Sequence, residues 1–177
     1  MHTQTQLKMN KDKILTLKNV TKSSIWELQE NDVFRLWEAA EKDADLKDYQ
    51  NKYIAVIRSA FEMEPVTVDR PEVIDKLMAR GFKIGTFRIN DKKEKYAIKK
   101  RPIMRVTDLT YENVSHITAN KLIELLERNF GGGWESLPQS IQDIIESNFD
   151  IKTSISKIII LRIKFFSSTH IILTQYG

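Results

Sequence analysis

Residues 82–101 read FKIGTFRINDKKEKYAIKKR, and this stretch decides the fold expected for the chain. Residues 82–89 are rich in side chains that favour strands, and residues 90–93 are polar, as turns are. After the turn, apolar and basic residues alternate, with Tyr96 and Ile98 on one face. The residues of the other face are Lys95, Ala97, Lys99 and Arg101. The pattern predicts an antiparallel β-hairpin whose solvent face is basic.

Positive charge is concentrated in and around this hairpin. Between Lys83 and Arg105 the chain has nine Lys or Arg residues and only Asp91 and Glu94 as acids, so this segment is net +7 while the whole chain is net +4. A patch of this kind attracts polyanions such as nucleic acid. The residues expected to bind nucleic acid or another anion are Lys76, Arg80, Lys83, Arg88, Lys92, Lys93, Lys95, Lys99, Lys100, Arg101 and Arg105.

Three amphipathic helices are expected before the hairpin. The first begins at Asn31, a favourable N-cap, and buries an apolar stripe that includes Trp37, which we expect to pack against the second helix near Tyr53 or Ile57. The second runs over 45–61 with Tyr49 among its inward residues. The third begins near Pro71 and ends at Gly81, and its inward residues would be Val73, Ile74, Leu77 and Met78.

The chain after the hairpin is expected to add a helical pair and a strand-forming end. A short strand over 103–106 is followed by one helix over 118–130 and another that begins near Ser136. Residues 151–177 combine strong β-propensity with low net charge, which predicts a C-terminal hairpin turning near Ser167, or an appendage. The polar residues 1–13 are expected to form a disordered tail.

The predicted architecture is a single α+β domain over 14–150, in which amphipathic helices pack with a small antiparallel sheet that contains the basic hairpin. Its order of helix, helix, helix and basic hairpin resembles that of winged helix-turn-helix DNA-binding domains. Residues 77–98 resemble the join between the recognition helix and the wing of those domains. The resemblance implies that the third helix enters the major groove while the hairpin touches phosphate or the minor groove.

The composition argues against several other classes of site. The chain has no Cys, so disulfides, thiolate metal sites and Cys nucleophiles are excluded, and a reducing cytoplasm suits it. The His residues at positions 2, 116 and 170 are too far apart to form a local ligand pair, so neither a metal nor a cofactor is expected. The apolar stretch 155–173 contains Lys157, Arg162 and Lys164, and each such charge costs about 2.5 to 3.5 kcal/mol at a bilayer centre, so no membrane span is expected.

The sequence motifs that could indicate an enzyme are incomplete. Residues 131–133 are three Gly residues before a helix, but no Lys-Ser or Lys-Thr pair follows them as in a phosphate-binding P-loop. Asp91 and Lys93 match half of a metal-dependent nuclease motif without a partner carboxylate. We therefore expect no catalytic residues, although a hydrolase or nuclease site assembled from distant positions stays an alternative.

The function expected from these observations is that of a non-enzymatic, cytoplasmic nucleic-acid-binding protein, with DNA as the expected nucleic acid. The main alternative is a small protein-interaction factor, an inhibitor or adaptor that presents the same basic face to a protein with an acidic surface. A charged hairpin is also compatible with no partner, because Lys residues on edge strands protect against aggregation.

Overall fold

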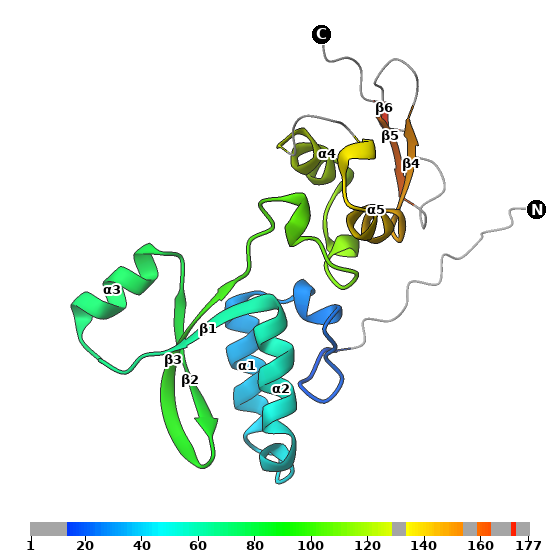
Figure 1. Cartoon of the computed structure of the whole chain (residues 1–177). Helices are drawn as coiled ribbons and strands as arrows, with labels where there is room; N and C mark the ends of the chain where they lie inside the picture. The colour runs from blue at the N-terminus through cyan, green and yellow to red at the C-terminus, as the bar shows by residue number, and fades with distance from the viewer. Residues whose placement is uncertain (1–13, 129–133, 154–158, 164–170, 173–177) are drawn as a thin grey trace, which may run out of the picture.

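The structure is a computed structural model that describes residues 14–128, 134–153, 159–163 and 171–172, and it confirms the α+β class (Figure 1). The helices are α1 (Glu30–Ala40), α2 (Leu46–Ala60), α3 (Pro71–Ala79), α4 (Ala119–Arg128) and α5 (Gln139–Glu146), with short 3-10 helices η1 (Ser24–Glu27), η2 (Val106–Asp108), η3 (Val114–His116) and η4 (Trp134–Ser136). The strands are β1 (Phe61–Pro65), β2 (Lys83–Ile89), β3 (Lys92–Lys100), β4 (Phe149–Thr153), β5 (Ile159–Ile163) and β6 (Ile171–Ile172).

Buried apolar residues form two clusters that lie in different parts of the chain. The first comprises residues between 17 and 98 and joins α1 and α2 to the sheet β1–β3. The second comprises residues between 106 and 149 and joins α4 and α5 to the start of β4. The single domain over 14–150 stays a prediction, and the tail 1–13 lies outside the described residues.

The sheet of the first cluster has the strand order β1-β3-β2, and each neighbouring pair is antiparallel. Strands β1 and β2 therefore run parallel on opposite sides of β3, and the chain from 66 to 82, which contains α3, crosses from one edge of the sheet to the other. In Figure 1 the hairpin β2–β3 stands between α3 on one side and α1 with α2 on the other. The winged-helix order is not confirmed, because β1 separates α2 from α3.

The face of the sheet toward α1 and α2, here called the inner face, is organised around Phe87. Its ring centroid lies 5.3 Å from that of Phe34, 4.9 Å from that of Trp37 and 5.5 Å from that of Tyr96. Trp37 is fully buried, as predicted, in the cluster that also holds residues 53 and 57 of α2. Gly85 admits Phe34, since a Cβ at Gly85 would lie 2.3 Å from the Phe34 ring. The helices and the hairpin thus interlock through aromatic rings.

Several sequence-based expectations need correction. Tyr49 is 48% exposed rather than inward, and α3 has no buried residue, with Met78 53% exposed and the other expected inward residues half-buried. The second helix ends at Ala60 rather than at residue 61, because Phe61 begins β1, whose residues 61–65 pair with β3 from Lys100 to Tyr96. The expected strand over 103–106 does not form, and Val106 instead begins η2.

The described residues of the C-terminal stretch form strands, while the hairpin or appendage over 151–177 stays a prediction. Strands β4, β5 and β6 pair in that order, and both pairs are antiparallel. The expected turn near Ser167 and the helix residue Phe130 lie outside the described residues.

Replacing Gly85 with Ala tests the contact between Gly85 of β2 and Phe34 of α1. We expect Gly85→Ala to lower the free energy of unfolding by about 1 to 3 kcal/mol, because the added methyl group overlaps the Phe34 ring. The double variant Gly85→Ala with Phe34→Ala should lose less stability than the sum of the two single losses, since removal of the ring relieves the overlap. Urea denaturation of the four proteins measures this coupling, and additive losses would contradict the proposed contact.

Candidate nucleic-acid interface

The tip of the β2–β3 hairpin is held in place by α2. The two turn residues, Asn90 and Asp91, have positive φ angles of 49° and 65°, which suits a two-residue hairpin turn. Buried Gln50 accepts a hydrogen bond from the main-chain N–H of Asn90 at 3.1 Å and donates one to its side-chain oxygen. Lys47 forms a 2.8 Å ion pair with Asp91. The turn is therefore positioned by side chains from a helix 40 residues away in sequence.

The predicted basic face of β3 lies opposite the inner face of the sheet and is here called the outer face. The strand pairing places Lys93 beside Arg88 and Lys95 beside Thr86 on this face. The expectation that Ala97 faces solvent is wrong, since Ala97 is fully buried. An ion pair and a hydrogen bond from β3 anchor the crossing segment 66–82 over this face, so only part of the face is open.

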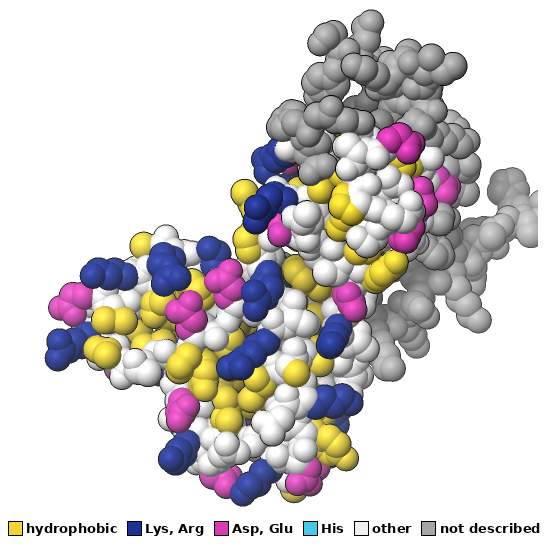
Figure 2. Space-filling view, viewed as in Figure 1, with side chains coloured by type: hydrophobic (Ala, Val, Ile, Leu, Met, Phe, Trp, Pro, Cys, Tyr) yellow, Lys and Arg dark blue, Asp and Glu magenta, His cyan; other side chains and the backbone are white. Residues whose placement is uncertain are grey.

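Three of the eleven candidate cations form ion pairs with acids that come from outside the basic segment. Arg80 lies 3.7 Å from Glu64 and Arg88 lies 3.8 Å from Glu41, while Lys95 pairs with Asp69. The acids belong to β1, to the end of α1 and to the crossing segment. Figure 2 accordingly shows Lys and Arg side chains interspersed with Asp and Glu rather than one unbroken positive surface.

Three further candidates donate to main-chain carbonyl oxygens. The Nζ atom of Lys99 lies 2.7 Å from the oxygen of Arg80, and the Nε atom of Arg101 lies 3.0 Å from that of Arg58. Lys100 is half-buried, with its Nζ atom 2.8 Å from the oxygen of Trp26. Burial lowers the pKa of Lys100 from its usual value, and nearby carboxylates oppose this only in part. These three cations stabilise the fold.

The remaining five candidates are exposed, and their charged groups make no ion pair or hydrogen bond within the described part of the chain. They are Lys76, Lys83, Lys92, Lys93 and Arg105. Three of them belong to the β2–β3 hairpin, one to α3 and one to the segment between the two hydrophobic clusters. The predicted site residues therefore fall into two groups: cations that are bonded to other parts of the protein, and cations whose charged groups have no partner among the described residues.

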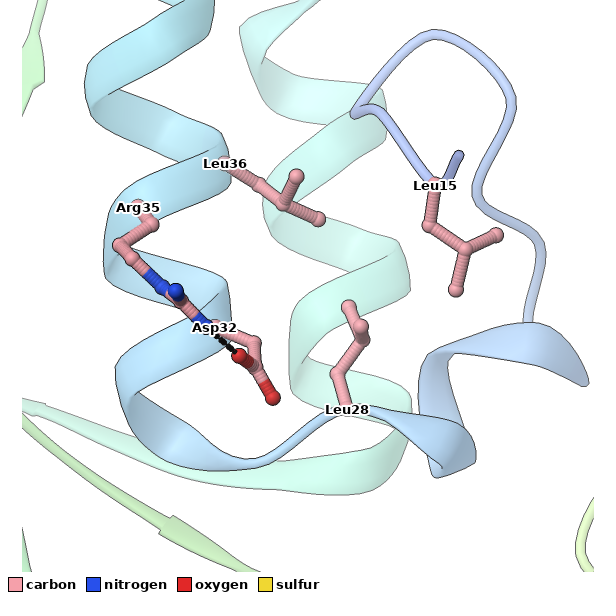
Figure 3. A pocket seen from close by; sticks show the side chains of 5 residues that line it. All are labelled: Leu15, Leu28, Asp32, Arg35 and Leu36. Atoms are coloured by element: carbon pink, nitrogen blue, oxygen red, sulfur yellow. Dashed lines mark hydrogen bonds and ion pairs between the residues drawn. The ribbon is translucent and has the colours of Figure 1, made fainter. Parts of the chain in front are cut away.

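A pocket of about 300 Å³ lies between α1 and the segment that precedes it (Figure 3). Its lining residues are Leu15, Leu28, Asp32, Arg35 and Leu36. The three Leu side chains converge in Figure 3, and Asp32 pairs with Arg35. The main-chain N–H of Gln29, followed by Arg35, lowers the pKa of Asp32. The pocket holds one neutralised ion pair and no nucleophile beside a base, so it offers no catalytic arrangement.

Other chemistry expected or excluded from the sequence can be compared with the described residues. Among them, no group of three or more His, Asp or Glu side chains could hold a metal ion. Asp91, half of the nuclease-like motif, is paired with Lys47, and the Gly residues 131–133 lie outside the description. None of the helices in the described ranges has both the length and the apolar character needed to cross a membrane.

No protein-family model, curated protein or solved structure matches this chain. The chemistry of the described residues is therefore the basis for assigning a function. The residues that sequence reasoning missed are the acids Glu41, Glu64 and Asp69, which neutralise part of the basic segment. These acids lie far in sequence from the cations that they contact, so no local sequence pattern could have predicted the ion pairs.

Gln50→Ala tests how the hairpin tip is positioned. We expect a loss of about 1 to 3 kcal/mol in the free energy of unfolding and faster hydrogen exchange at the tip, because two hydrogen bonds to Asn90 are removed. Lys47→Ala is the control, since it removes only an exposed ion pair to the same turn and should leave the melting temperature almost unchanged. Equal effects of the two substitutions would show that Gln50 does not position the turn.

Proposed function

We propose that this protein binds nucleic acid, DNA in particular, through the free cations around its β2–β3 hairpin, and that it does so in the cytoplasm without catalysing a reaction. The observation that supports this most is the set of exposed cations Lys83, Lys92 and Lys93, which have no partner among the described residues and lie on a hairpin whose tip is fixed by α2. Free cations release the counterions of a phosphate backbone without first losing an intramolecular partner.

The paired cations contribute to this proposal in two different ways. Arg80 forms an ion pair with Glu64 at 3.7 Å on the surface, and exposed pairs of this kind are worth about 0 to 1 kcal/mol, so exchange of the acid for a phosphate costs little. Arg88 lies 3.8 Å from Glu41, whose side chain is 16% exposed, and Glu41 keeps a partner in the main-chain N–H of Arg88 if the guanidinium turns to a phosphate. Lys100 is different, because its departure would leave the Trp26 carbonyl without a donor. We therefore assign phosphate contact to the free and ion-paired residues, and a structural role to Lys99, Lys100 and Arg101.

The double variant Lys92→Glu with Lys93→Glu tests the proposal. An electrophoretic shift assay over a salt series should show weaker binding to duplex DNA, with the slope of log affinity against log salt reduced by roughly 0.9 for each phosphate that the variant no longer neutralises. The matched control is Lys22→Glu with Lys52→Glu, which changes the net charge equally at exposed residues outside the hairpin. The control should keep most of the affinity and the slope.

Two outcomes would overturn the proposal. The first is that the unmodified protein fails to bind duplex or single-stranded nucleic acid at low salt. The second is that the two double variants weaken binding equally, because binding would then follow net charge rather than the hairpin.

A protein partner is the second candidate, and α3 is the observation that favours it. This helix has no buried residue, and its own Met78 is 53% exposed, while Val68 in the segment before it is 45% exposed. An inhibitor or adaptor with this surface should retain its partner after complete nuclease digestion in a pull-down. Met78→Asp should then release the partner while leaving nucleic-acid binding unchanged, whereas loss of the captured protein on digestion alone would favour the nucleic-acid proposal.

A further inference from the structure

The hydrogen bonds of β2 show which of its main-chain groups point away from the sheet. The N–H of Arg88 donates to Oε1 of Glu41 at 3.0 Å, outside the pairing with β3. Along a strand, main-chain groups point alternately toward one neighbour and toward the other. The N–H and C=O groups of Ile84 and Thr86, which share the phase of Arg88, therefore point away from β3 as well.

Both ends of this edge are closed by other parts of the protein. The N–H of Phe82 donates to the oxygen of Leu77 at 3.1 Å, and the N–H of Arg88 is taken by Glu41. Between these ends, the N–H groups of Ile84 and Thr86 have no acceptor within the described residues. Ile84 is half-buried and Thr86 is exposed. The open part of the edge is therefore short and has defined limits.

The opposite edge of the same sheet is blocked. The N–H of Val66 donates to the oxygen of Lys95 in β3. The main-chain N–H and C=O groups of the odd-numbered residues of β1 therefore point away from β3. Of these, Phe61 donates to the oxygen of Ile57, and Pro65 has no N–H. Only Met63 is left with a free outward N–H among the described residues of β1, so β2 is the edge on which a further strand can pair.

We propose that the edge of β2 at Ile84 and Thr86 binds an extended acidic peptide of a protein partner, which adds a strand to the sheet. Two N–H and two C=O groups in the outward phase are what an antiparallel peptide strand pairs with. On the outer face, peptide side chains would lie beside Thr86 and Arg88 and near Lys93, which favours acids. On the inner face, the peptide would pass Gly85 and the half-buried ring of Phe34, which favours an apolar side chain.

Charge also decides between a foreign peptide and a second copy of this chain. Edge-to-edge pairing of two β2 strands would bring two copies of the same basic hairpin side by side, and the repulsion between like charges destabilises such pairing. An acidic peptide avoids this repulsion. The strand pairing uses main-chain groups, whereas nucleic-acid binding uses side chains of the hairpin, and the two proposals share only the cations Arg88 and Lys93.

A fluorescein-labelled peptide of alternating Val and Glu, about seven residues long, is a suitable probe for the full-length protein. We expect Thr86→Pro to weaken binding roughly tenfold, because it removes an N–H that donates to the peptide but none that pairs with β3. Thr86→Val is the matched control, since it keeps the N–H, and its affinity should stay within about twofold of the unmodified protein. Fluorescence anisotropy measures both.

Peptide variants keep the test decisive if Thr86→Pro does not fold. Methylation of the peptide nitrogens that face β2 should abolish binding to the unmodified protein, and exchange of Glu for Lys should weaken it strongly. The proposal is overturned if the unmodified protein does not bind the probe, if the methylated peptide binds equally well, or if folded Thr86→Pro keeps full affinity. It is also overturned if the edge is occupied by a second copy, seen as a dimer that Thr86→Pro dissociates.

Discussion

The packing of Phe87 against Phe34, Trp37 and Tyr96 is the contact on which the placement of the hairpin depends. Ring centroids at 4.9 to 5.5 Å with steep interplanar angles correspond to the tilted and edge-to-face geometries that aromatic rings prefer. The Nε1 atom of Trp37 is buried without a hydrogen-bond partner in the described part, so packing rather than its indole N–H holds Trp37 in this cluster. Once Phe87 faces α1, the alternation of side chains along β2 and β3 determines whether each remaining side chain of the hairpin lies on the inner or the outer face.

The hairpin could be predicted because the alternation of its apolar and basic residues is visible in a short stretch of sequence. Alternation of apolar and basic residues specifies both the strand and its faces, and the two residues between β2 and β3 favour a tight turn. The partial exposure of α3 could not be predicted in the same way. An apolar stripe such as Val73, Ile74 and Leu77 shows that a helix has one apolar side, but what covers that side depends on the path of the chain across the sheet. The strand β1 was missed for the same reason, since its pairing with β3 is tertiary.

The candidate site illustrates the difference between charge along a sequence and charge on a surface. A count over 83–105 finds an excess of cations, yet Glu41, Glu64 and Asp69 approach the site from other elements and neutralise part of it. Segments of opposite charge that fold together compensate each other, and only the tertiary structure shows which cations stay free. Lys92 and Lys93 stay free because they follow the turn at the tip, where no other described element carries an acid toward them.

The hairpin therefore offers two kinds of chemistry, one from its charged side chains and one from its main chain. The exposed ammonium groups of Lys83, Lys92 and Lys93 would interact with an anion at long range, with little geometric demand and strong dependence on salt. Its outward N–H and C=O groups at Ile84 and Thr86 act only in contact and require an extended backbone in one register. Because Glu41 takes the N–H of Arg88 and Leu77 accepts from Phe82, this edge is too short to template open-ended sheet growth, while two paired residues suffice to orient a bound strand. Cations along such a short edge would repel a second basic edge and attract an acidic strand, so on this proposal the same charges would disfavour self-pairing and favour an acidic peptide.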